Sequence, residues 1–230
     1  MLPLRDKNPS GIVPWMVYVL IAANAVVFIH EISLPPEDLA AFIGRYSVVP
    51  ERVTRALHGR GDLLAAAIIP ALSSMFLHGG WLHIIGNMWF LLIFGDNVEA
   101  RFGRFRFLIF YLFCGVAAMA TQYALYPHSR IPTLGASGAI AGVLGAYLVR
   151  WPGARILTLV PFFFFIQFVE LPAILVLGFW FLIQFFQGAA SLGVHFTHGV
   201  AYWAHVGGFI AGAVLMTILP AAKGRRYPRG

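Results

Sequence analysis

Residues 133–150 read TLGASGAIAGVLGAYLVR, an apolar run in which small residues recur at regular intervals. Gly138 and Gly142 are four residues apart, so they share one face of a helix. Small residues at this spacing let a second transmembrane helix approach closely. Gly208 and Gly212 repeat the spacing near the C-terminus. The sequence therefore predicts that two apolar helices pack together through glycine-lined faces, and Gly135 is counted with these packing glycines.

Two side chains that can do chemistry lie on these helices. His205 is three residues before Gly208, which places the imidazole on the predicted contact face. Ser137 directly precedes the first glycine of the partner face. The packing therefore brings Ser137 near His205, and a serine within hydrogen-bonding range of a histidine is an activated nucleophile.

A third polar group lies in an earlier apolar segment. His83 and Asn87 are four residues apart and share a helix face, where two hydrogen-bond donors could hold an oxyanion. A polar contact between helices remains the alternative interpretation. A metal site at His78 and His83 is disfavoured, because they are five residues apart and lack an acidic neighbour. We expect neither a metal nor a cofactor.

Composition separates the protein from soluble classes. Of 230 residues, 60% are hydrophobic and only 11% are charged, and the mean hydropathy is +0.79. So few charges cannot cover a soluble globule of this size. The net charge of +7 is explained by basic residues near span ends, so we expect no nucleic-acid partner. We expect an all-α membrane protein with a single membrane domain over residues 1–230.

Hydropathy predicts six transmembrane helices joined by loops. A further apolar stretch, Leu63–Phe76, contains a proline and is short for a span, so we interpret it as re-entrant or interfacial. Two interpretations fit residues 156–169: an interfacial connector, or an early start of the fifth span. The predicted spans are Ile12–Ile32, Trp81–Phe94, Phe105–Tyr123, Thr133–Val149, Leu171–Phe186 and Val200–Leu219.

The distribution of positive charge predicts the orientation. If both ends are cytoplasmic, eleven of the 16 Lys and Arg residues lie inside and five outside, as the positive-inside rule requires. The cytoplasmic tails are then residues 1–11 and the basic residues 220–230. The second, fourth and sixth spans run from outside to inside, which puts His83, Ser137 and His205 within roughly 10 Å of the outer boundary. This common depth favours one shared site.

In these motifs, the sequence resembles the rhomboid family of intramembrane serine proteases, most closely its bacterial members. The motifs are Gly-Ala-Ser-Gly at 135–138, Ala-His-x-x-Gly-x-x-x-Gly at 204–212, His-x-x-x-Asn at 83–87 and Glu-Ala-Arg at 99–101. The resemblance implies a six-helix rhomboid bundle whose first outer loop is partly embedded in the membrane. It implies Ser137 as nucleophile, His205 as general base, and His83, Asn87 and the Ser137 N–H as oxyanion donors. His78 matches a further family histidine near the site.

The resemblance also sets the expected activity and location. It implies an endopeptidase of the cell's inner membrane that cleaves transmembrane protein substrates near the outer boundary through an acyl-enzyme, with lipid as its surroundings. One departure is Ala141, where some members carry an aromatic residue under the histidine ring, so His205 must be held in another way. A Trp-Arg pair that some members carry in the first loop is absent. The alternatives are a non-catalytic rhomboid-like binding protein and, less favoured, a channel or transporter.

Overall fold

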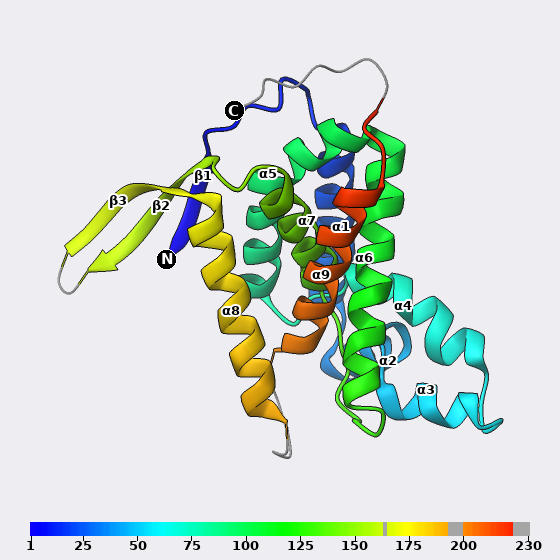
Figure 1. Cartoon of the computed structure of the whole chain (residues 1–230). Coiled ribbons are helices and arrows are strands. Elements are labelled where there is room, and N and C mark those ends of the chain that lie inside the picture. Colours follow the sequence, from blue (N-terminus) through cyan, green and yellow to red (C-terminus); the bar gives the residue numbers. More distant parts are fainter. Residues whose placement is uncertain (163–164, 193–199, 223–230) are drawn as a thin grey trace.

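A computed structural model describes residues 1–162, 165–192 and 200–222, and in this part of the chain the fold is mainly helical (Figure 1). A long helix lies at each of the six predicted spans, so the predicted helical membrane bundle is confirmed. These helices are α1 (Trp15–Ser33), α5 (Trp81–Phe102), α6 (Arg104–Leu125), α7 (Ser137–Arg150), α8 (Ala173–Ser191) and α9 (Tyr202–Ile218).

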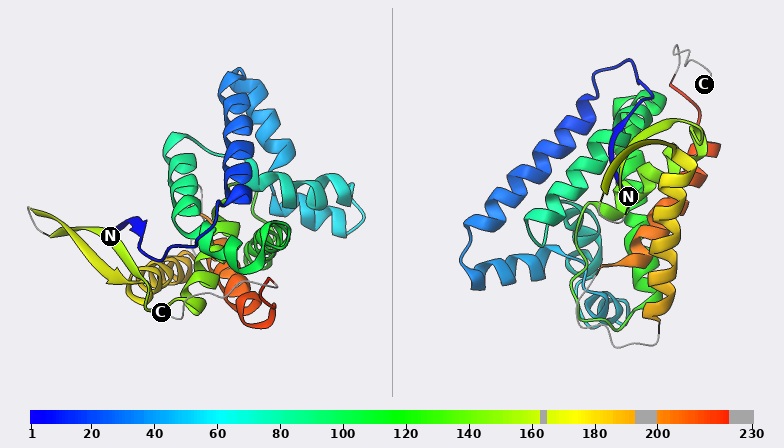
Figure 2. Two further views of the ribbon diagram at one scale, coloured as in Figure 1. Left: turned by 90° about the horizontal axis from the view of Figure 1, so that it is seen from above. Right: turned by 90° about the vertical axis from the view of Figure 1, so that its left-hand side faces the viewer.

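Helix α7 forms the centre of the bundle and contacts α5, α6, α8 and α9 (Figures 1 and 2). Its contact with α9 is close enough to require glycine. A Cβ atom on Gly208 would lie 2.0 Å from the carbonyl oxygen of Gly138, and one on Gly212 would lie 1.9 Å from that of Gly142. The two predicted glycine faces therefore meet backbone to backbone.

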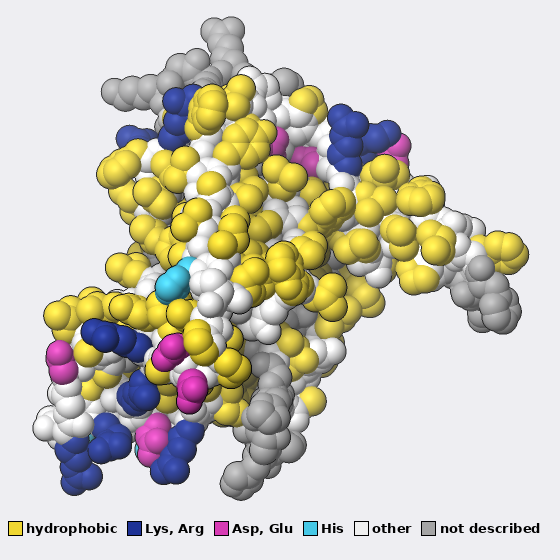
Figure 3. All heavy atoms as spheres, turned by 180° about the vertical axis from the view of Figure 1, so that it is seen from behind, with side chains coloured by type: hydrophobic (Ala, Val, Ile, Leu, Met, Phe, Trp, Pro, Cys, Tyr) yellow, Lys and Arg dark blue, Asp and Glu magenta, His cyan; other side chains and the backbone are white. Residues whose placement is uncertain are grey.

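Three helices, α1, α6 and α8, are long and apolar enough to cross a membrane by length and composition. A fourth candidate joins residues Leu64–Phe76 to α5 through a bend of 81°. Helices α7 and α9 are apolar but shorter, and α7 is almost entirely buried among its neighbours. Hydrophobic side chains cover most of the surface between the charged ends (Figure 3). The chain is thus a multi-pass membrane protein.

The long connection between α1 and α5 consists of short helices that project from the bundle at one end (Figure 1). They are α2 (Pro36–Tyr46), α3 (Pro50–Leu57), a π-helical turn η1 (Leu64–Ile68), α4 (Ile69–Ser73) and a 3₁₀ turn η2 (Ser74–Phe76). The predicted re-entrant stretch is helical, and Leu64, Ile68 and Ile69 remain exposed on it. Apolar side chains exposed in this way suit contact with lipid.

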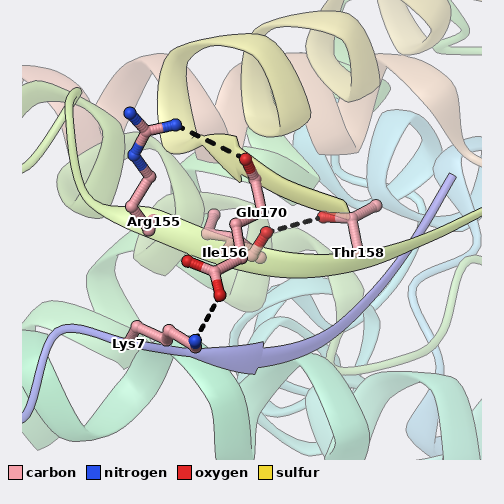
Figure 4. A network of polar contacts seen from close by, with 5 residues as sticks. All are labelled: Lys7, Arg155, Ile156, Thr158 and Glu170. Atoms are coloured by element: carbon pink, nitrogen blue, oxygen red, sulfur yellow. Dashed lines mark hydrogen bonds and ion pairs between the residues drawn. The ribbon is translucent and has the colours of Figure 1, made fainter. Parts of the chain in front are cut away.

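A three-stranded antiparallel sheet is the main difference from the prediction. We expected residues 156–169 to be a connector or the start of the fifth span. The described residues of this range lie in strands β2 (Arg155–Phe162) and β3 (Phe165–Pro172). Strand β1 (Leu2–Asp6) pairs with β2 on its other edge. Lys7 and Glu170 form an ion pair across the sheet, and Arg155 donates to the Glu170 carbonyl (Figure 4). The fifth long helix accordingly begins at Ala173.

The N-terminal tail is therefore partly ordered by the sheet. Asp6 accepts hydrogen bonds from the Asn8 backbone and from Asn97 Nδ2 on α5, 2.7 Å away in each case. Burial raises the pKa of Asp6 to about 6, although these hydrogen bonds oppose the shift. Nearby, the buried Glu99 carboxylate accepts the free N–H groups of Met16 and Val17 at the start of α1. Of the predicted tail at 220–230, residues 223–230 lie outside the described residues.

Candidate active site

The first residue of α7 and the first turn of α9 place the serine and the histidine together. Ser137 Oγ lies 2.8 Å from His205 Nε2. His205 is buried, and Ser137 is half-buried at the wall of a cavity. Because Ser137 begins α7, its backbone N–H has no partner within the helix. This N–H and the positive end of the helix dipole are therefore available to a developing negative charge beside the serine.

The second nitrogen of the histidine has a partner that the sequence did not suggest. Gln184 Oε1, from α8, lies 2.6 Å from His205 Nδ1, and both side chains are buried. An amide oxygen can only accept, so Nδ1 carries the hydrogen and Nε2 presents its lone pair to Ser137. The Trp180 ring, also from α8, lies 5.8 Å from the His205 ring at 34°. Helix α8 thus supplies the support that Ala141 cannot give.

His83 faces the same space from α5. Its Nδ1 lies 3.4 Å from the Gly79 backbone N–H and accepts there, so Nε2 is the donor. A Cβ atom on Gly135 would lie 2.7 Å from His83 Nε2 and 3.6 Å from Ser137 Oγ. Gly135 therefore leaves open the space between these two groups.

Gly135 differs from its predicted role. It precedes α7, with φ +117°, and makes no helix–helix contact of the kind seen at the other four glycines. Its backbone N–H donates to the Ser74 carbonyl at 2.8 Å. This backbone conformation favours glycine, and a side chain would collide with His83. Gly135 lies beside His83 and Ser137 rather than in the packing between the helices.

Asn87 and His78 form a polar pair, of which Asn87 faces the cavity. Asn87 Nδ2 lies 3.0 Å from His78 Nε2, and Asn87 lines the cavity whereas His78 does not. The buried Glu31 carboxylate, from α1, accepts the His78 backbone N–H at 3.1–3.2 Å. His78 consequently contacts the site through Asn87 and through the His83 ring, whose centroid lies 5.1 Å from its own.

A cavity of about 820 Å³ contains four of the polar groups that the sequence singled out. Ser137, His205, His83 and Asn87 all line it. Its wall has further polar side chains that suit water, namely Gln122, Tyr126, Ser129, Thr133 and Ser191. Gln122 Oε1 also accepts the Ala204 backbone N–H at 3.3 Å, which ties α6 to the first turn of α9.

The bulky aromatic residues of α8 divide between two faces. Trp180 and Phe181 turn inward and contact the Phe209 ring on α9, at 6.2 and 4.5 Å between ring centroids. Phe179 and Phe186 are 47% and 64% exposed. One helix therefore contacts both the site and the surroundings of the bundle.

Sequence reasoning missed Gln184 and Glu31 for different reasons. Glu31 carried a signal, because a carboxylate within an apolar span is rare and marks a functional or structural site. Gln184 carried almost none, since one amide in an aromatic helix is unremarkable until α8 is placed beside α9.

Comparison with known proteins identifies the family of the chain. The family model of the rhomboid domain matches residues 66–222, which contain every site residue except Glu31. RHOMBOID-like protein 4 of Arabidopsis thaliana is 28% identical over 231 residues, covering 90% of this chain and 52% of that protein. Rhomboid-like protein 11, chloroplastic, of the same plant is 30% identical, covering 64% of this chain and 51% of that protein.

A vertebrate relative matches over a shorter stretch. Presenilin-associated rhomboid-like protein A, mitochondrial, of Danio rerio is 34% identical over 131 residues, covering 54% of this chain and 34% of that protein. The chain spans about half the length, or less, of these curated relatives. The family match covers more than half of the chain and includes the serine, the histidine and both glycine faces, so the chain belongs to the rhomboid family.

Proposed function

We propose that this protein is an intramembrane serine endopeptidase that cleaves transmembrane protein substrates with a Ser137–His205 dyad. The observation that carries the proposal is the 2.8 Å contact between Ser137 Oγ and His205 Nε2 inside a cavity of about 820 Å³. A nucleophile and a base at this distance, with the base oriented by a third group, have the geometry of nucleophilic catalysis. Here the third group is Gln184.

In the first step, Ser137 Oγ attacks the scissile carbonyl carbon while His205 Nε2 takes the hydroxyl proton. The His205 imidazolium then gives this proton to the leaving amine, and an acyl-enzyme remains on Ser137. Water, activated by the same nitrogen, releases the acyl group and regenerates the serine. Gln184 keeps Nδ1 as a donor throughout, which leaves Nε2 as the atom that exchanges the proton.

Three donors are suited to the oxyanion that forms on the carbonyl oxygen. They are His83 Nε2, the Asn87 amide and the Ser137 backbone N–H. Fixed donors in a site of low dielectric stabilise a developing charge more than water does. The substrate must arrive unwound, because an intact helix engages its carbonyls in hydrogen bonds. Residues that weaken a substrate helix therefore favour cleavage.

The test is cleavage of a single-span substrate by the purified protein in detergent, beside Ser137→Ala and His205→Ala. We expect cleavage by the wild type and none above background by either variant. Cleavage that survives in Ser137→Ala would exclude Ser137 as the nucleophile. A folded wild type that neither cleaves nor reacts with a serine-directed reagent favours the non-catalytic binding protein.

A further inference from the structure

A second cavity, of about 580 Å³, lies in the loop between α1 and α5, away from Ser137. Its floor is made of small side chains and backbone from α2 and η1, including Ala41, Gly44 and Ala66. Its polar wall is almost entirely basic. Four arginines line it: Arg45, Arg52, Arg55 and Arg60.

Arginines outnumber acidic side chains in the lining of this cavity. Asp62 is the acidic residue among the cavity's lining residues, and one of its carboxylate oxygens accepts the Leu64 N–H at 2.8 Å. Within the described ranges, none of the four guanidinium groups forms an ion pair, and the ion pair of this region joins Glu51 to Arg130 instead. Arg52 donates to the Gly44 carbonyl. Four like charges around one cavity repel one another, and a bound anion relieves that repulsion.

The position of the cavity selects the kind of anion. Helix α1 is a 19-residue span that ends at Ser33, so the loop that follows lies at the membrane boundary. Beside the cavity, Leu64, Ile68 and Leu72 are 51%, 54% and 44% exposed, which suits contact with acyl chains. Figure 3 shows Lys and Arg side chains at this end of the molecule, interspersed with Asp and Glu side chains and bordered by hydrophobic ones. An apolar surface beside a basic cavity matches the acyl chains and the anionic headgroup of a lipid.

Topology does not account for these charges. The orientation predicted from the other basic residues puts this loop on the outer side, where the positive-inside rule disfavours arginine. A guanidinium group binds phosphate oxygens with two parallel hydrogen bonds, and it is weakly hydrated at an interface. A cluster of such groups is therefore suited to a phosphate ligand.

We propose that this cavity binds the phosphate of an anionic phospholipid headgroup, with the acyl chains lying along the exposed apolar side chains of η1 and α4. Free inorganic phosphate shares the recognition chemistry but would leave the apolar surface unused. The proposal is independent of proteolysis, because none of these residues lines the Ser137 cavity.

The experiment is native mass spectrometry of the full chain in a mild detergent with added phosphatidylglycerol or phosphatidylcholine. The test variant is Arg52→Gln/Arg55→Gln, and the matched control is Arg104→Gln/Arg106→Gln, which removes the same charge at the start of α6. We expect the phosphatidylglycerol-bound fraction to fall about fivefold in the test variant, the effect of losing roughly 1 kcal/mol of hydrogen bonding. The control should stay within about twofold of the wild type.

Equal retention by the wild type and the test variant would overturn the proposal, as would an equal loss in the control. Arg45→Gln/Arg60→Gln, which removes the other two arginines, gives a second test should the first variant not fold. In a final arm, inorganic phosphate competes with the lipid. Displacement by millimolar phosphate would overturn the lipid assignment in favour of a soluble phosphate ligand, whereas retention supports the lipid.

Discussion

Ser137, His205, His83 and Asn87 could be singled out from the sequence because each is a costly or reactive group inside an apolar segment. Their convergence on one cavity follows from glycine spacing that the sequence also displays. Gln184 could not be found in the same way, because its importance comes from a 2.6 Å contact between two helices. Local patterns reveal which residues are unusual, but contacts between helices decide which ordinary residues matter.

The Gln184 contact leads to a prediction about the rate of cleavage. Gln184→Met keeps the length of the side chain but removes the acceptor for His205 Nδ1, so the imidazole loses its fixed tautomer. We expect kcat to fall about tenfold, equivalent to a hydrogen bond of roughly 1.4 kcal/mol, with KM within about twofold. Gln184→Glu keeps an acceptor and should retain most of the rate. If Gln184→Met keeps the wild-type kcat, Gln184 only fills space.

A second prediction concerns the oxyanion. His83→Ala removes the donor that faces Ser137 across Gly135, and loss of one such donor lowers kcat by about 10²–10³. The exposed His30 on α1 provides a matched control, since His30→Ala removes a histidine away from the cavity. Cleavage assays on both variants decide the matter. Wild-type kcat in His83→Ala would exclude His83 from oxyanion stabilisation.

Among the elements, the sheet was not predicted, because the length of the apolar stretch suggests a helical span and hides the alternation of side chains along the strand. Residues 155–162 place β-branched side chains at Ile156, Thr158 and Val160, a spacing of two that is typical of a strand. Ile156 and Thr158 are fully buried, as this spacing predicts. Pairing with residues near the N-terminus completes the sheet, and no local pattern indicates that partner.

The contact between α7 and α9 predicts a large effect from one methyl group. Gly212→Ala places a Cβ where the Gly142 carbonyl oxygen lies, and backbone cannot move aside as a side chain does. We expect destabilisation of about 1–3 kcal/mol, as for other overpacked cores. Gly178→Ala is the control, because Gly178 on α8 has no atom within 4 Å of an added Cβ. Thermal unfolding in detergent compares them, and equal midpoints would contradict the close packing.

The burial of Asp6 beside the sheet predicts how the stability of the protein depends on pH. Burial raises the pKa of Asp6 from 3.8 to about 6, so the folded state binds more protons than the unfolded state between these values. Stability from this group is therefore greatest below pH 4 and falls as the pH rises to about 6. Asp6→Asn cannot ionise. Its unfolding temperature relative to the wild type should rise between pH 4.5 and 7.5, and a difference that stays constant would contradict the shift.

At the scale of the whole molecule, hydropathy located all six long helices, although their ends differ by several residues from the prediction. Helix α7 has 14 residues, which at about 1.5 Å per residue is shorter than a bilayer core. It is shielded by the surrounding helices, so it does not need a full apolar length facing lipid. No sequence pattern predicted the helical structure of the loop between α1 and α5 or its arginine-lined cavity.

The predicted topology can be tested with introduced cysteines, because the sole native one, Cys114, is buried. Glu37 on α2 and Gly153 after α7 are both exposed. We expect a membrane-impermeant maleimide to label Glu37→Cys in intact cells. Gly153→Cys should be labelled only after the membrane is opened. The reverse pattern would invert the orientation and place the Ser137 cavity at the opposite face.

The most direct test of the account asks whether Ser137 is chemically activated by His205. The folded protein in detergent is treated with a fluorophosphonate, and the adduct is located by peptide mass spectrometry. The account predicts an adduct on Ser137 in the wild type, and its loss in His205→Ala, because the alkoxide no longer forms at the 2.8 Å contact. An unlabelled Ser137 in folded wild type, or equal labelling in His205→Ala, would contradict it.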